Sequence, residues 1–172
     1  MNEFFTNNPS SIVASNRILY TPSIFARSSL LHLQEIGELE ARRAHTSSRS
    51  GLQSYLFITV VSGEGSLVYG GKEVSLAQGD CVFIDCQSPY SHTTSPSNLL
   101  TLRWIHFYGA SIPQIYEKYK ERGGRPVFRP EEDNSSEVWS KLFETAGGHD
   151  YMRDMLINQH LSSLLTLIMA ES

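Results

Sequence analysis

Residues 79–109, GDCVFIDCQSPYSHTTSPSNLLTLRWIHFYG, decide the fold of this chain. A Gly-Asp turn opens an apolar strand, a turn-rich segment follows at 87–98, and a second strand ends the stretch. Because side chains alternate between the two faces of a strand, Trp104, His106 and Tyr108 share one face. This order predicts two adjacent strands of a small β-barrel whose mouth is lined by aromatic and histidine side chains.

Strand patterns cover the whole of residues 24–109. Residues 52–61, LQSYLFITVV, end in a segment that is apolar on both faces, which is typical of a strand covered on both sides. Gly70 and Gly71 separate GSLVY from KEVSL and predict a two-residue hairpin turn. SLLHLQEI and ELEARRAH flank Gly37 and are compatible with a hairpin or with one long bent strand. Many short strands at regular turn spacing predict a sandwich or a barrel.

After the last strand the apolar period changes to that of helices. Pro113 fits the first position of one helix. A second helix is expected to begin at Asn134 or Ser135, where Glu137 is placed for a capping box. A third is expected over residues 150–172, and it ends without a capping signal, so we expect the natural polypeptide to continue.

The chain has 172 residues, of which 40% are apolar and 19% charged, so it suits one domain with an ordinary core. The net charge of -4 argues against direct binding to DNA or to an anionic membrane. No apolar run is long enough to span a membrane, and the N-terminus does not resemble a secretory signal, so we expect a cytoplasmic protein. Residues 1–23 are polar and predict an arm, with a frayed terminus as the alternative.

The two cysteines, Cys81 and Cys86, lie on one predicted strand. Five residues of extended chain place them roughly 17 Å apart and on opposite faces. That distance excludes a disulfide, so we expect buried, reduced thiols.

Three segments in order are similar to a known family. They are Arg49 with residues 55–57 (YLF) and 62–65 (SGEG), residues 76–80 (LAQGD), and residues 104–109 (WIHFYG). Together they resemble the N-terminal effector-binding and dimerisation domain of AraC-type bacterial transcription regulators. The resemblance covers most of the chain and implies a cupin-like fold.

The fold class implied is mainly β, a cupin-like double-stranded β-helix (a jelly-roll barrel) followed by two to three α-helices. The expected division is an N-terminal arm at 1–23, a ligand-binding barrel at 24–109 and a helical dimerisation segment at 110–172. The resemblance also implies a helix-turn-helix DNA-binding domain after residue 172, through which alone the protein would contact DNA.

The resemblance implies that Arg49 and Trp104 line an effector pocket and that the loop carrying Tyr90 and His92 reaches the ligand. The candidate ligand-binding residues are Arg49, Tyr90, His92, Leu102, Trp104, His45 and His106. Four of them have an ordinary alternative, namely core packing for Trp104, a solvated loop charge for Arg49, a turn for His92 and a hydrogen-bonded strand histidine for His106.

A carbohydrate effector fits these residue types, because sugars need an aromatic face for their C–H surfaces and fork-like donors for their hydroxyls. Trp104 and Arg49 can supply both. Leu102 stands where the arabinose sensor has a polar ligand contact, so we expect a larger or differently oriented sugar, or a non-sugar effector, rather than arabinose.

The last helix carries an apolar stripe that either covers the barrel or meets a twofold mate. The resemblance favours a homodimer. The candidate dimerisation residues are Leu161, Leu164, Leu165 and Ile168.

Signals for catalysis are weak. His45 lacks the second histidine of a His-x-His pair, and with His92 it makes two imidazoles without a carboxylate, a poor metal site. No nucleophile elbow or phosphate loop is present. We therefore expect no metal, no cofactor and no enzyme activity. The alternatives are a small metal-dependent cupin enzyme, an isomerase or dioxygenase, and a dimerisation module whose pocket has filled in.

Overall fold

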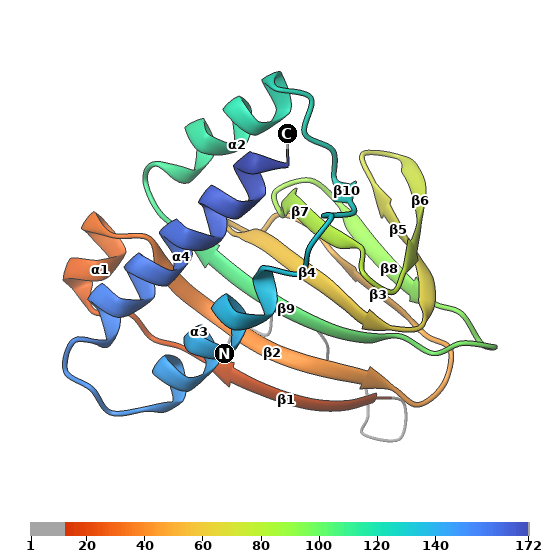
Figure 1. The fold of residues 1–172 in the computed structure, drawn as a ribbon, viewed down its shortest axis with the longest axis horizontal. Coiled ribbons are helices and arrows are strands. Elements are labelled where there is room, and N and C mark those ends of the chain that lie inside the picture. Colours follow the sequence, from red (N-terminus) through yellow and green to blue (C-terminus); the bar gives the residue numbers. More distant parts are fainter. Residues whose placement is uncertain (1–12, 172) are drawn as a thin grey trace.

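The computed structural model describes residues 13–171. Two antiparallel sheets face each other, and helices cover the outer side of the larger sheet (Figure 1). In chain order the elements are β1 (Val13–Leu19), α1 (Ile24–Ser29), β2 (His32–Ala41), β3 (Thr46–Arg49), β4 (Tyr55–Ser62), β5 (Glu64–Tyr69), β6 (Lys72–Ala77), β7 (Cys81–Asp85), β8 (Tyr90–Thr94), β9 (Thr101–Tyr108), α2 (Ile112–Glu121), β10 (Val127–Phe128), α3 (Ser135–Gly147) and α4 (Arg153–Ala170).

The larger sheet has six strands in the order β1-β2-β9-β4-β7-β10, and the smaller has four in the order β3-β8-β5-β6. The mainly β fold with C-terminal helices predicted from the sequence is confirmed. The hairpin at Gly70 and Gly71 is confirmed as well, since both residues have positive φ (59° and 77°) between β5 and β6. Within residues 13–171 no helix combines the length and apolar character needed to cross a membrane.

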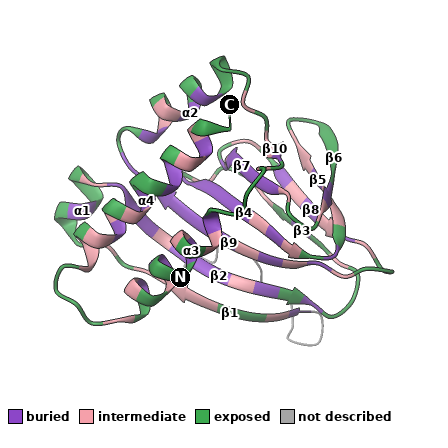
Figure 2. Ribbon diagram, viewed as in Figure 1, coloured by how far each residue is buried: buried purple, intermediate pink, exposed green. Residues whose placement is uncertain are grey.

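Buried residues run along the strands of the larger sheet (Figure 2), and they form two clusters, one on each face of that sheet. The layer between the sheets, which we call the interior, joins Leu56 and Trp104 to Leu67 of the smaller sheet. The other layer lies between the outer face of the larger sheet and α2, α3 and α4. Cys81 belongs to the helix layer and Cys86 to the interior, as expected for opposite faces, and both are free thiols.

The predicted dimerisation residues do not form an exposed stripe in the single chain. All four are buried in the layer between α4 and the larger sheet, where they cover the outer face of that sheet. That they take part in dimerisation stays a prediction. The four residues are Leu161, Leu164, Leu165 and Ile168.

SLLHLQEI and ELEARRAH form one strand, β2, with a β-bulge between Leu33 and Glu35. A bulge inserts one extra residue and shifts the alternation of faces. Leu33 and Ile36 therefore both pack in the helix layer, while Glu35 contacts Trp104 in the interior.

Three local expectations are wrong. Val13–Leu19 belongs to the sheet as β1, paired with β2, rather than to an arm; residues 1–12 of that arm lie outside the described residues. Ile24–Ser29 is a short helix, because the Ser23 side chain accepts a hydrogen bond from the Ala26 amide at its N-terminus. Tyr90–Thr94, expected in turns, is strand β8 and pairs with both β3 and β5.

The capping box expected at the start of the second helix is also absent from the structure. The Asn134 side chain makes no cap hydrogen bond. The Asp133 carboxylate instead accepts hydrogen bonds from the backbone amides of Ser135 and Ser136, at 3.2 Å each. Asp133, one residue before Asn134, thus supplies the hydrogen-bond acceptor for the backbone amides at the N-terminus of this helix.

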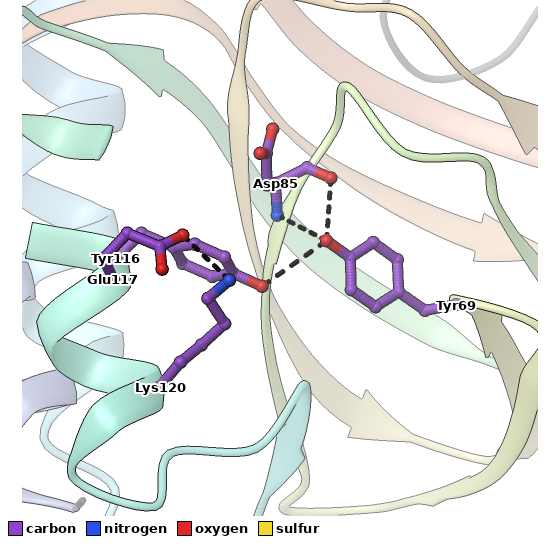
Figure 3. A network of polar contacts seen from close by, with 5 residues as sticks. All are labelled: Tyr69, Asp85, Tyr116, Glu117 and Lys120. Carbon is purple, nitrogen blue, oxygen red and sulfur yellow. Dashed lines mark hydrogen bonds and ion pairs between the residues drawn. The ribbon is translucent and has the colours of Figure 1, made fainter. Parts of the chain in front are cut away.

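A polar network joins the smaller sheet to α2 (Figure 3). The Tyr69 hydroxyl donates to the Asp85 carbonyl at 3.0 Å and accepts from the Asp85 amide at 3.3 Å. The Tyr69 hydroxyl also lies 3.4 Å from the Tyr116 hydroxyl. The Lys120 ammonium lies 5.1 Å from the centre of the Tyr116 ring and forms an ion pair with Glu117 at 2.8 Å. The hairpin β5–β6 is therefore anchored to both β7 and α2.

Candidate ligand-binding site in the barrel interior

Trp104 forms part of the floor of the interior. It lies on β9 between Gly37 of β2 and Ile58 of β4, and it is fully buried. A Cβ atom at Gly37 would lie 2.6 Å from Cζ2 of the indole. The indole therefore lies directly over the backbone of β2, in space that only a glycine leaves open.

Glu35 stands beside the indole on the same strand as Gly37. The Trp104 indole N–H donates to Glu35 Oε2 at 3.3 Å, and the Arg17 guanidinium of β1 lies 3.4 Å from Oε1. The Glu35 side chain is fully buried. β1, β2 and β9 thus place a cation, a carboxylate and an aromatic ring in one row of the interior.

His106 follows Trp104 on the same face of β9. Its Nδ1 atom is hydrogen-bonded to Ser54 Oγ at 2.9 Å and lies 3.9 Å from the Cys86 sulfur. Burial, assisted by the positive charge of Arg49, lowers the pKa of His106 to about 3. The ring is therefore neutral at neutral pH.

The smaller sheet supplies the opposite wall. Tyr90 pairs with Arg49, and His92, two residues on, lies 5.9 Å from the ring of His45. Burial, and then the charges of His45 and Arg49, lower the pKa of His92 to about 3. The Tyr90 hydroxyl is buried near the Cys86 thiol and makes no hydrogen bond of normal geometry with the described residues.

An open pocket of about 760 Å³ adjoins this wall, where β3 and β8 meet the β5–β6 turn. Arg49 and Tyr90 line it, so these two residues connect the interior with the surface. Its lining residues are Ser48, Arg49, Ser50, Val68, Gly71, Pro89, Tyr90 and Ser91.

The candidates chosen from the sequence converge on the interior from both sheets, with His45 contributed by the loop before β3. Leu102 and Trp104 share one buried cluster with Tyr90, and the Arg49 charge lowers the pKa of both His92 and His106. That these residues bind a ligand stays a prediction.

The sequence analysis missed the Glu35 carboxylate and its Arg17 partner. The sequence contained a signal for it. Leu31 and Leu33 are two residues apart, as expected for one face of a strand, but the next apolar residue on that face is Ile36 rather than residue 35. Such a phase shift indicates a bulge, and a bulge re-aims a side chain.

The chemistry of the interior is that of stacking and hydrogen bonding. Within residues 13–171 no three His, Cys, Asp or Glu side chains are grouped so that they could hold a metal ion. Burial raises the pKa of the Cys81 and Cys86 thiols to about 12, so both are protonated and unreactive at neutral pH. An indole face, neutral imidazoles, a phenol and a carboxylate with its guanidinium partner are the groups that recognise small polar molecules.

Residues 35–165 match the family model of the AraC-like ligand-binding domain, so the chain belongs to that family. The structure is also similar to that of CuxR, an AraC-like transcriptional activator, with 12% identity, a TM-score of 0.56 and coverage of 80% of this chain. The chain spans about half of CuxR (51%). The cupin-like jelly-roll fold and the AraC-type resemblance are thus confirmed.

More distant similarities are to cupin barrels. A cupin 2 conserved barrel domain protein from Leptotrichia buccalis is 17% identical, with a TM-score of 0.44 over 59% of this chain and 43% of that one. A predicted oxalate decarboxylase from Thermotoga maritima is 16% identical, with a TM-score of 0.42 over 44% of this chain and 67% of that one. No curated protein matches the chain at a significant level.

Proposed function

We propose that this domain binds a small effector between its two sheets, with a carbohydrate as the first candidate. The domain performs no reaction on the effector. In a longer regulator, binding would control a C-terminal helix-turn-helix domain acting on DNA in the cytoplasm. The observation that carries the proposal is the Trp104 indole on the interior floor, with His106 beside it on the same face of β9 and with Tyr90 and His92 on the smaller sheet. Membership of the ligand-binding family supports it.

A sugar suits this interior for two physical reasons. The indole offers a flat apolar surface to ring C–H groups, and Leu102 beside it extends that surface. His92 and His106 are neutral, and a neutral imidazole has one nitrogen that donates and one that accepts, both suited to hydroxyl groups; the Nδ1 atom of His106 already bonds Ser54. Effector binding can shift the regulator between two arrangements only by its differential affinity for them.

Tyr90→Phe is expected to lower effector affinity while leaving the unliganded domain as stable as wild type, or more so. The hydroxyl it removes is buried without a normal hydrogen bond, a condition that costs roughly 1–3 kcal/mol. Thermal-shift measurements against sugars and other metabolites identify the effector, and calorimetric titration of that compound then measures affinity. An effector at 100 times its Kd should stabilise the wild type by about 2.7 kcal/mol.

Tyr119→Phe is the matched control. Its hydroxyl donates to the Arg125 carbonyl at 2.6 Å in the helix layer, so removal should lower stability and leave effector affinity unchanged. A Tyr90→Phe protein that is destabilised and binds the effector normally would contradict the proposed site.

We also propose that the domain forms a homodimer through α1 and the start of α4 rather than through the buried stripe. Ile24 is 88% exposed and Phe25 59%, and Met155 on α4 is 45% exposed. Asp154 joins the two helices by accepting a hydrogen bond from the Ser23 amide at 3.2 Å. Ile24, Phe25 and Met155 are thus exposed apolar residues on two helices that this hydrogen bond joins, and we call the three the α1–α4 surface.

Phe25→Lys is expected to convert the dimer to a monomer, because it places a charge in the centre of the α1–α4 surface. Sedimentation velocity over a range of protein concentrations measures the change. Val74→Lys, at an exposed position on β6, is the control. Dimers that persist in Phe25→Lys would show that another surface is used.

A further inference from the structure

The fully buried Glu35 carboxylate is the strongest feature of the interior that the proposed function leaves unused. Its position is not a by-product of regular strand alternation, because the bulge at Leu33/Glu35 is what turns it inward. Bulges of this kind are frequent beside functional sites, where they re-aim one side chain. Burying a carboxylate is costly unless it is paired and hydrogen-bonded, and Arg17 and Trp104 are among the groups that compensate this cost.

Two of the groups that contact Glu35 come from neighbouring strands. The indole N–H of Trp104 donates to Oε2 at 3.3 Å, and the Arg17 guanidinium donates to Oε1 at 3.4 Å. Each carboxylate oxygen is therefore oriented by a donor from a neighbouring strand. The arrangement positions the carboxylate at the edge of the indole.

An effector lying on the indole would therefore bring its edge groups to Glu35. A carboxylate only accepts hydrogen bonds, so it selects groups that donate them. Two neighbouring hydroxyls match its two oxygens, whereas an effector carboxylate or phosphate at this edge would be repelled. Cationic effectors are disfavoured by the positive charges of Arg17 and Arg49 in the same interior.

We propose that Glu35 is a specificity-determining residue that accepts hydrogen bonds from two adjacent hydroxyls of the effector, an inference that rests on the proposed function. Arg17 is a positioning residue that orients the carboxylate. The effector class this assigns is a neutral sugar or cyclitol with free adjacent hydroxyls and an apolar C–H face for Trp104.

The test uses D-glucose, D-galactose, D-xylose and myo-inositol, with benzoate and L-leucine as probes lacking adjacent hydroxyls. Compounds that raise the melting temperature of the wild type are titrated by calorimetry, together with their singly deoxygenated analogues. Glu35→Gln keeps the shape but removes the charge, so we expect a loss of affinity of roughly 10- to 100-fold. The variant should also lose the ability of the wild type to distinguish the sugar from at least one deoxy analogue.

Glu38→Gln is the matched control, since Glu38 lies on the same strand and faces Arg103 outside the interior at 3.8 Å. It should bind every probe as the wild type does. Glu35→Asp is the second variant in case Glu35→Gln does not fold. It keeps the charge and shortens its reach, and we again expect weaker binding of the sugar.

The outcomes separate this inference from the proposed function. If a sugar binds and the folded Glu35 variants bind it and its deoxy analogues like the wild type, Glu35 is only structural and the inference fails alone. If only a probe without adjacent hydroxyls binds, effector sensing stands and the assigned class is wrong. If no small molecule of any kind binds, both fail.

Discussion

Gly37→Ala is expected to lower the free energy of unfolding by about 1–3 kcal/mol, the range of overpacked cores, and to abolish effector binding. The new Cβ atom would lie 2.6 Å from the Trp104 ring and 2.8 Å from Cβ of Arg17. The ring is rigid and fully buried, so it must leave its place on β2 and with it the hydrogen bond to Glu35. Urea unfolding and effector titration measure the two effects.

A double-mutant cycle with Trp104→Phe shows whether the clash is the cause. Phenylalanine lacks the outer ring that lies over Gly37, so the alanine should cost much less in that background. Equal costs of Gly37→Ala in both backgrounds would mean that the indole does not explain the effect and that the clash with Cβ of Arg17, or strand flexibility, does.

The second large effect is a loss of stability in acid, below about pH 6.5. In the folded protein His92 and His106 have pKa values of about 3, whereas an unfolded histidine has a pKa near 6.5. Between these pH values the unfolded state binds more protons than the folded state. The contribution of the two histidines to the free energy of unfolding is therefore fully present above pH 6.5 and falls as the pH decreases toward 3. At about 1.4 kcal/mol per pH unit for each histidine, acidification from pH 7 to 5 removes roughly 4 kcal/mol.

Urea unfolding at pH 7, 6 and 5 measures this slope. His92→Gln and His106→Gln should each reduce the slope, because glutamine does not titrate in this range. Gln159→Asn, at an exposed position on α4, replaces one side chain that does not titrate by another, so it serves as the control and should keep the wild-type slope. A slope that neither interior substitution reduces would place the acid sensitivity elsewhere.

Much of the fold follows from local sequence pattern. Apolar residues repeat every two positions before residue 109 and with the helical period after it. This change separates the barrel from the helices, because each period places apolar side chains on one face of its element. Gly70 and Gly71 specify their hairpin because a tight turn needs positive φ at both positions. The placement of Cys81 and Cys86 on opposite faces follows from alternation alone.

The short elements missed by sequence analysis depend on neighbours distant in the chain. β1 is a strand because β2 pairs with it, and β8 is a strand because it lies between β3 and β5. Neither segment has a strong apolar alternation of its own, and strand preference depends on the packing partners.

The site divides in the same way. Motif order and face-sharing on one strand were enough to select Trp104 and His106, since those are properties of β9 alone. Only the tertiary structure places Arg49 and His92 opposite them and buries the α4 stripe against the sheet. These outcomes depend on the register of strands, and on which faces pack together, in elements far apart in the chain. The packing energy between two such elements depends on both of them, so the sequence of either one alone does not predict it.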